Sequence, residues 1–146
     1  MRGLLRAALL GLLPLLRRCL PARSASACRA ASENEAYRAL VDAWLAEQYT
    51  LRYSGAMVPD VHMLLTKGHG VFANPVSPGA PPKLRSLYEC LPLALVVEAA
   101  GGAAIDGEGE VLDGVLAGHD QRRSVCLGSR GEVARCRAAM GLPPSQ

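Results

Sequence analysis

Several chemical signatures are missing from this chain of 146 residues. No serine lies in the nucleophile-elbow pattern of hydrolases, and the spacing of His62, His69 and His119 does not join them in one metal site. No Cys-x-x-Cys pair occurs, and the five cysteines are an odd number, so a disulfide framework is not expected. Cys90 and Cys126 lie within apolar runs and are predicted to be buried free thiols.

The first 32 residues contain six arginines but no lysine and no acidic residue. Setting them aside leaves ten of the sixteen basic residues against all thirteen acidic ones, so the rest of the chain carries a net charge of −3. A nucleic-acid backbone is bound by clustered cations, which this acidic balance does not supply. We therefore predict no nucleic-acid partner for the body of the chain.

Residues 1–32 also lack a long uninterrupted apolar run. The leucine-rich stretch Leu4–Leu16 contains Arg6 and Pro14, whereas a membrane-spanning helix needs about 20 apolar residues, so no stable membrane span is expected. The arginine-rich, acid-free composition of residues 1–32 best fits an organellar transit peptide. The alternatives are a secretory signal, cleaved after Ala25-Ser26-Ala27, and an uncleaved or artefactual start.

The remainder alternates between helical and strand patterns. Helices are predicted over 34–48, 57–67, 86–100 and 130–140, strands over 49–53, 71–73 and 124–127, and short extended pieces over 103–106 and 111–112. Four prolines exclude regular structure from the loop 74–82. The 86–100 segment is so apolar that we expect it to be buried on most sides. This alternation predicts a layered α/β domain over residues 33–141, followed by a short tail, 142–146.

Two segments combine residue types that suit phosphate chemistry. Residues 52–62 (RYSGAMVPDVH) read as a strand, a glycine turn and a helix start, a geometry that favours an anion, although Arg52 and Tyr53 also suit a surface charge and a packed ring. Residues 83–90 (KLRSLYEC) place cations and hydroxyl groups beside the carboxylate of Glu89. Such a segment could bind one phosphate and hold a metal ion for another.

These two segments resemble the C-terminal half of the class I fructose-1,6-bisphosphatase and sedoheptulose-1,7-bisphosphatase family. The resemblance extends from about Asn34 to Gly141 and includes the stretches GVFAN (70–74), AAGG (99–102), VLD (111–113) and LGS (127–129). It implies an α/β/α layered domain with a small mixed sheet. It also implies metal-dependent hydrolysis of a sugar bisphosphate, assembly into a homo-oligomer, and a plastid location, with another organelle or the cytoplasm as alternatives.

Carried over residue by residue, the resemblance implies that Tyr53 and Lys83 bind the phosphate remote from the reaction. Arg52 is expected to reach into the neighbouring subunit's site, and Met57 to line the sugar. Asn74 stands where fructose bisphosphatases usually have a tyrosine, which favours a sedoheptulose bisphosphate as the substrate. An amide can still donate a hydrogen bond to this ligand in place of a phenol.

Glu89 matches the family's metal-binding glutamate, and a carboxylate is a suitable ligand for Mg²⁺ or Mn²⁺. The alternative is a first-turn glutamate stabilised by the helix dipole. The family's N-terminal glutamate and Asp-Pro-x-Asp-Gly-Ser loop have no counterpart here, so the isolated chain is expected to be inactive or to associate with full-length subunits. Asp106, Glu108 and Glu110 indicate a solvated hairpin turn, because the last position of a calcium loop is Ala117.

Overall fold

The computed structural model describes residues 19–20 and 25–143. Most of the predicted leader, residues 1–18 and 21–24, and the end of the predicted tail lie outside this part. The helices are α2 (Ala25–Glu33), α3 (Glu35–Ala46), α4 (Met57–Lys67), α5 (Leu91–Ala99) and α6 (Arg130–Ala139), with a π-helical turn, Ser86–Cys90, and a 3₁₀ turn, Val111–Asp113. The strands are β1 (Cys19–Leu20), β2 (Thr50–Leu51), β3 (Val71–Asn74), β4 (Leu84–Arg85), β5 (Ala103–Ile105), β6 (Arg122–Arg123) and β7 (Val125–Gly128).

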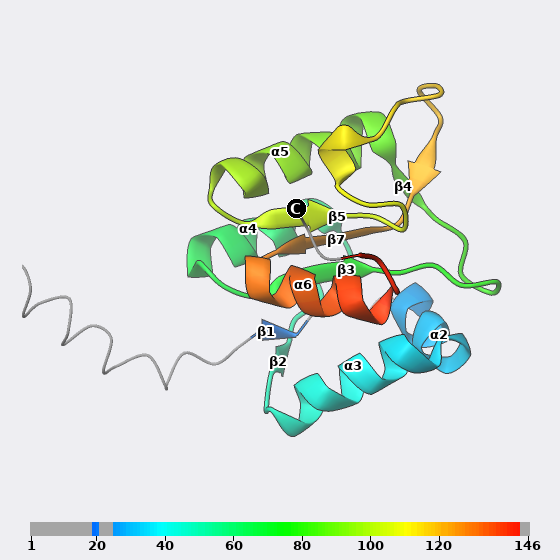
Figure 1. Ribbon diagram of the computed structural model, residues 1–146. Helices are drawn as coiled ribbons and strands as arrows, with labels where there is room; N and C mark the ends of the chain where they lie inside the picture. The colour runs from blue at the N-terminus through cyan, green and yellow to red at the C-terminus, as the bar shows by residue number, and fades with distance from the viewer. Residues whose placement is uncertain (1–18, 21–24, 144–146) are drawn as a thin grey trace, which may run out of the picture.

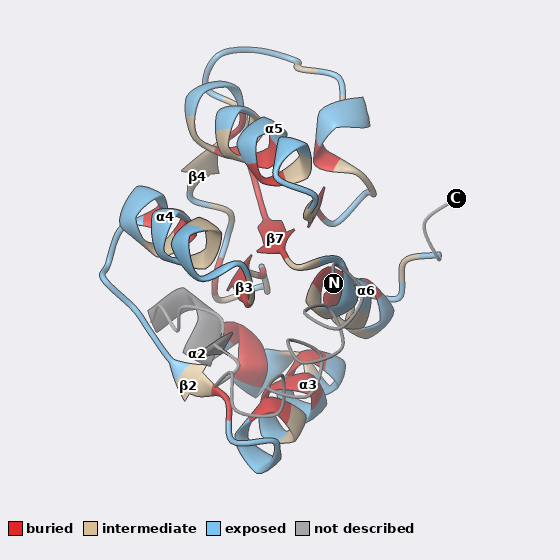
Figure 2. Ribbon diagram, turned by 90° about the vertical axis from the view of Figure 1, so that its left-hand side faces the viewer, coloured by how far each residue is buried: buried red, intermediate tan, exposed pale blue. Residues whose placement is uncertain are grey.

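The central sheet has three strands in the order β3-β7-β5, and both pairings are antiparallel. Leu127 of β7 lies opposite Phe72 on one side and Ala104 on the other, and all three belong to one core cluster. Because side chains alternate along a strand, the next residue of each strand faces the opposite layer. Figure 2 shows β7 buried between helices on both faces.

Two apolar cores result from this alternation. On one face α4 and α5 pack against the sheet, and on the other α2 and α6 do so, with α3 packed against these two helices (Figure 1). Trp44 is fully buried in the second core, beside Ile105 and Val133. The α/β class and the layered arrangement are therefore confirmed. The central sheet is antiparallel throughout, and the one parallel pair among the described strands is β1 with β2.

Helix α2 crosses the predicted boundary between the leader and the domain. Ala30 and Ala31 are buried in the core that α3 lines. At its end, the Glu33 carboxylate accepts the N–H of Gly79 at 2.8 Å, while the Arg29 guanidinium donates to the Gly79 carbonyl at 3.0 Å. Residues 29–33 thus pack with the domain, and the boundary at 32/33 falls inside a helix.

Helix α4 has the predicted bounds. It ends at Gly68, whose left-handed backbone (φ 70°) lets its N–H donate to the Leu64 carbonyl at 2.8 Å. The expectation for 86–100 is wrong in two respects. The segment begins as a π-helical turn, and Pro92 in the next turn has no N–H to continue a regular pattern.

Burial of 86–100 is also one-sided. Ala94 and Val97 face the sheet at 0% and 3% exposure, whereas Leu95 on the outer face is 60% exposed. The reason is that α5 forms an outer layer, with the sheet on one side only, and its outward face is exposed in Figure 2. No helix among the described residues is long and apolar enough to cross a membrane.

Candidate functional site

Lys83 and Glu89 lie at the two ends of a short segment made of β4 and the π-helical turn. Glu89 is half-buried, and its Oε2 accepts the backbone N–H of Arg85 at 2.6 Å. The Arg85 guanidinium in turn pairs with Asp120 at 2.5 Å and lies 5.7 Å from the ring centre of Tyr88. The Glu89 carboxylate therefore has a fixed position at the start of the turn, with one oxygen engaged by the backbone.

Strand β6 holds this segment from the side. Leu84 lies opposite Arg123 and Arg85 opposite Arg122 in an antiparallel pair. The Arg122 guanidinium donates to the carbonyl of Lys83 at 3.0 Å, and the Lys83 side chain is exposed. The segment thus presents an ammonium group to solvent at one end and a carboxylate at the other.

Glu89 supplies the donor chemistry of a divalent-metal site but not a complete ligand set. A carboxylate oxygen suits hard ions such as Mg²⁺ or Mn²⁺. Within residues 19–20 and 25–143, however, no three His, Cys, Asp or Glu side chains gather to hold a metal ion. Burial, with a smaller contribution from the Glu89 charge, raises the pKa of the adjacent Cys90 thiol to about 12, so this sulfur stays protonated. Glu89 is therefore suited to be one of several ligands of such an ion.

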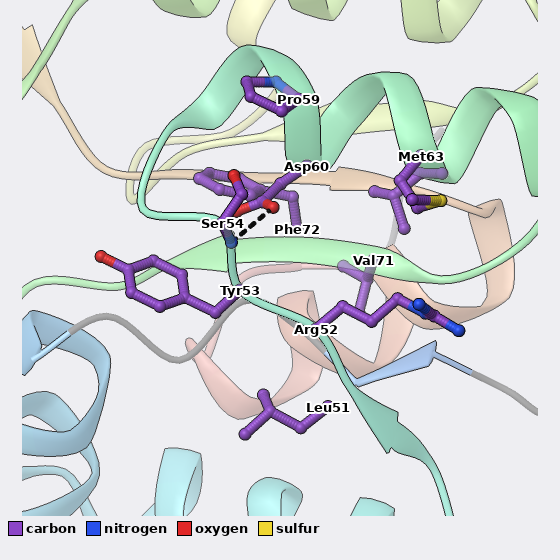
Figure 3. Close-up of a pocket in the computed structure, with 10 residues that line it drawn as sticks. Leu51, Arg52, Tyr53, Ser54, Pro59, Asp60, Met63, Val71 and Phe72 are labelled. Carbon is purple, nitrogen blue, oxygen red and sulfur yellow. Dashed lines mark hydrogen bonds between the residues drawn. The ribbon is translucent and has the colours of Figure 1, made fainter.

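Arg52 and Tyr53 line a cavity of about 380 Å³ between α4, β3 and the segment 51–54. Figure 3 shows their side chains pointing to opposite sides of that segment. Tyr53 is half exposed and Arg52 is exposed, so neither is fixed by packing. Within this chain the phenol and the guanidinium do not converge on one anion.

Asp60 is a cavity residue for which the sequence predicted no role. Its Oδ1 accepts the N–H of Ser54 at 3.0 Å, as the dashed line in Figure 3 marks. Since Asp60 lies in the first turn of α4, a negative charge already stands beside the helix N-terminus. This carboxylate opposes the anion that the strand-turn-helix pattern favoured.

Met57 and Asn74 occupy framework positions. Met57 begins α4 and is 7% exposed, in contact with the core that Phe72 lines. Asn74 ends β3, opposite Val125, and is half-buried. Neither lines the cavity of Arg52 and Tyr53, and Lys83 and Glu89 do not line it either. The six predicted residues therefore lie in three places. Arg52 and Tyr53 line this cavity, Lys83 and Glu89 lie at the β4 segment, and Met57 and Asn74 occupy framework positions.

The predicted turn at 106–110 is present, but its first residue is not solvated. Asp106 is 4% exposed, and its Oδ1 accepts the N–H groups of Glu108 and Gly109 at 2.7 and 3.1 Å. Its other oxygen pairs with the guanidinium of Arg123 at 2.7 Å. The expectation of a solvated hairpin was wrong for Asp106, because its carboxylate is buried together with the guanidinium of Arg123, 17 residues away in sequence.

Comparison with known proteins identifies relatives for most of the chain. Residues 22–141 match the model of the fructose-1,6-bisphosphatase C-terminal domain. A chloroplastic sedoheptulose-1,7-bisphosphatase of Triticum aestivum is 46% identical over 107 residues, which cover 73% of this chain and 27% of that protein. A class 1 fructose-1,6-bisphosphatase of Helicobacter hepaticus is 41% identical over 98 residues, or 66% of this chain and 35% of that protein.

Solved structures give the same result. A Toxoplasma gondii crystal structure assigned as a sedoheptulose-1,7 bisphosphatase matches with a TM-score of 0.78 and 41% identity, over 88% of this chain and 40% of that chain. The T-state structure of Leishmania major fructose-1,6-bisphosphatase matches with a TM-score of 0.74 and 31% identity, over 86% of this chain and 39% of that chain. The chain thus spans well under half the length of these relatives.

Proposed function

Because this chain belongs to the fructose-1,6-bisphosphatase family through its C-terminal domain, we propose that it forms the substrate-binding half of a sugar bisphosphatase. The reaction is metal-dependent hydrolysis of sedoheptulose-1,7- or fructose-1,6-bisphosphate to the monophosphate. The carrying observation is that one short segment exposes the Lys83 ammonium at one end and holds the Glu89 carboxylate against the Arg85 N–H at the other. In this proposal, Lys83 at one end of the segment binds a phosphate and Glu89 at the other end binds a metal ion.

In this proposal Lys83 and Tyr53 bind the phosphate that does not react. A phosphate dianion is bound well by a cation together with hydroxyl donors, and both side chains are exposed in this chain. Met57 lines the sugar from the start of α4, and the Asn74 amide donates a hydrogen bond near the phosphate. Anchoring one end of the substrate in this way orients the other end for attack by water.

Glu89 would contribute one carboxylate to Mg²⁺ or Mn²⁺. Such ions, when bound, stabilise the charge on the phosphoryl oxygens and make a bound water more acidic. The hydrogen bond from the Arg85 N–H leaves the second oxygen of Glu89 available for the ion. Since the described residues do not gather three ligands, the complete site needs further ligands, and we expect this chain alone to be inactive.

The substrate proposal favours a seven-carbon sugar. Asn74 replaces a tyrosine of the fructose enzymes, and the match to the wheat sedoheptulose-1,7-bisphosphatase extends over 107 residues, against 98 for the Helicobacter hepaticus fructose-1,6-bisphosphatase. Competition between the two sugar bisphosphates for the purified chain, followed by calorimetry, would distinguish them. Tighter binding of the fructose compound would reverse this assignment.

Binding and turnover test the proposal separately. Sedoheptulose-1,7-bisphosphate should bind the purified chain, and Lys83→Ala should weaken binding by about tenfold or more, since a charge-assisted contact is lost. Lys67→Ala is the matched control, because Lys67 is also an exposed lysine. Equal affinities of the two variants would refute the role of Lys83. Phosphate release above that of a Glu89→Ala variant would refute the expected inactivity.

A second candidate function follows from the direction of Arg52. This guanidinium points away from Tyr53 and is exposed, so it is available to a neighbouring subunit (Figure 3). The chain would then be a non-catalytic partner of full-length bisphosphatase subunits. Co-purification with such a subunit, weakened by Arg52→Ala and not by Lys67→Ala, is the expected result. If neither the wild-type chain nor the Lys67→Ala variant co-purifies with a full-length subunit, this function is excluded.

The proposed location is the plastid, since the plant relatives are chloroplastic proteins and residues 1–32 have the composition of a transit peptide. A fluorescent protein fused after residue 32 should enter plastids of a plant cell. Cytoplasmic fluorescence would contradict this location.

A further inference from the structure

Beneath the segment that carries Lys83 and Glu89 lies a buried group of three polar side chains. Arg123 and Asp106 are 8% and 4% exposed, and Ser86, the first residue of the π-helical turn, is fully buried. The Arg123 guanidinium donates from Nη1 to Asp106 Oδ2 at 2.7 Å and from Nε to Ser86 Oγ at 3.0 Å. A single arginine therefore joins the end of β5, strand β6 and the start of the turn.

Each end of this connection is fixed. Asp106 also accepts two backbone N–H groups of its own turn, so its carboxylate cannot rotate freely. Ser86 donates its backbone N–H to the Gln121 carbonyl at 2.8 Å, which ties the same residue to the chain just before β6. The guanidinium also passes close to Gly114, where an added Cβ would lie 2.6 Å from Nη1. Arg123 is thus held in one place from three sides.

A buried ion pair contributes little net stability, because desolvation of both charges offsets their attraction. Its geometry, by contrast, is strictly defined, since a displaced partner would leave a buried charge unpaired. The π-helical turn has no side-chain cap at its start, where the Arg85 N–H donates to the Glu89 carboxylate of the turn itself. Ser86 is therefore the point at which the fold can fix the Glu89 turn.

We propose that Arg123 and Asp106 are positioning residues that hold the Ser86–Cys90 turn, and with it the Glu89 carboxylate, in place for a divalent metal ion. The metal part of this inference rests on the proposed function of Glu89. The positioning part rests only on the contacts above. Arg123 acts on the turn through its hydrogen bond to Ser86.

Amide hydrogen exchange of the full chain, followed by NMR, tests the positioning. Ser86→Ala removes only the link to Arg123, and Gly114→Ala displaces the guanidinium without changing its charge. Both variants should speed exchange of the Arg85 and Ser86 amides by about tenfold or more, because a hydrogen bond to a charged group is lost. Amides of β7 should keep their wild-type rates. Gly118→Ala is the control, since its Cβ meets nothing within 4 Å in the same loop.

Unchanged exchange at Arg85 in both variants would overturn the positioning, and so would an equal acceleration in β7, which would indicate a general loss of stability. Mn²⁺ titration supplies a second readout. Paramagnetic broadening should be strongest for amides 86–90, should disappear in Glu89→Gln, and should require several-fold more Mn²⁺ in Gly114→Ala than in Gly118→Ala. Equal titrations of the two glycine variants would overturn the link to the metal ion.

The two proposals fail in different ways. If Glu89→Gln leaves the broadening unchanged, the metal role of Glu89 is wrong and the metal part of this inference falls with it. The exchange rates of Arg85 and Ser86 then decide the positioning alone.

Discussion

The indole N–H of Trp44 donates to Glu132 Oε2 at 2.9 Å, across 88 positions of sequence. The same carboxylate accepts the hydroxyl of Tyr49 at 2.5 Å, and the guanidinium of Arg135 lies 5.8 and 5.7 Å from the two aromatic ring centres. The Glu132 carboxylate on α6 thereby accepts one hydrogen bond from Trp44 in α3 and another from Tyr49, which follows α3. This cluster joins α3 and the residues just after it to the last helix of the domain.

Removal of this acid should be costly. In Glu132→Ala the Trp44 N–H loses its acceptor in a fully buried position, so we expect a loss of about 2–3 kcal/mol in the free energy of unfolding. Urea denaturation measures it. Glu35→Ala, at an exposed glutamate in the first turn of α3, should cost well under half of that. Equal losses of unfolding free energy in the two variants would show that the Glu132 cluster stabilises the fold no more than an exposed glutamate does.

The contact between α2 and the proline-rich loop gives a second prediction. A Cβ on Gly79 would lie 2.2 Å from Glu33 Oε1, so Gly79→Ala should displace the Glu33 carboxylate and break the hydrogen bond by which it holds the end of α2 to this loop. Limited proteolysis should then cut within 25–33 about tenfold faster than in wild type. Gly118→Ala, at an open position, should leave the cleavage rate unchanged. If both variants resist proteolysis equally, α2 does not depend on this contact.

The two faces of α5 should respond differently to truncation. Val97 is 3% exposed, and Val97→Ala should destabilise the chain by about 2 kcal/mol through a cavity. Leu95 is 60% exposed, and Leu95→Ala should change the free energy of unfolding by no more than about 0.5 kcal/mol. Thermal and urea unfolding of both variants measures the contrast. A large loss at Leu95 would mean that this face is covered in solution.

Glu98 should make the free energy of unfolding depend on pH. Burial raises its pKa above the usual 4.5, and the nearby Glu110 and Asp113 raise it further. The folded state therefore binds this proton more tightly than the unfolded state, so the stability it contributes is complete below the usual pKa and is lost as the pH rises through the raised value. Glu98→Gln should match wild type at about pH 3.5 and be more stable at about pH 7.

Urea midpoints at the two pH values test this sign. Glu108→Gln, at an exposed glutamate of the neighbouring turn, is the control and should show no such difference. A Glu98→Gln variant that is less stable than wild type at about pH 7 would contradict the prediction.

Local patterns predicted part of the regular structure: α3, α4, α6, β3, β5 and β7 lie within a residue or two of the expected ranges, whereas the extended piece expected at 111–112 is a 3₁₀ turn. The helix 57–67 follows from its apolar spacing and from the glycine at 68, both of which are contained in a dozen residues. Strands β4 and β6 could not be predicted in this way, because two residues each carry no alternation. Helix α2 was missed since its alanine-rich sequence continues the composition of the leader, and its burial depends on contacts with α3 and Gly79.

The site was predictable only in its local features. Lys83 and Glu89 lie six positions apart, so the sequence shows that they are close. The strand predicted over 49–53 already implied that the neighbours Arg52 and Tyr53 point to opposite sides, because side chains alternate along extended backbone, and Figure 3 shows this arrangement. The pairing of Asp106 with Arg123, by contrast, depends on the tertiary fold.

The position of β7 in the sheet affects how the chain can fold during synthesis. Strands β3 and β5 each pair with β7 and not with each other, yet β7 is formed by residues 125–128, late in the sequence. As the ribosome extends the chain, both partners must wait with unpaired edges until this last strand emerges. The central sheet can therefore form only after residues 125–128 have been synthesised, and a chaperone acting on a shorter nascent chain would encounter a domain without the middle strand of its sheet.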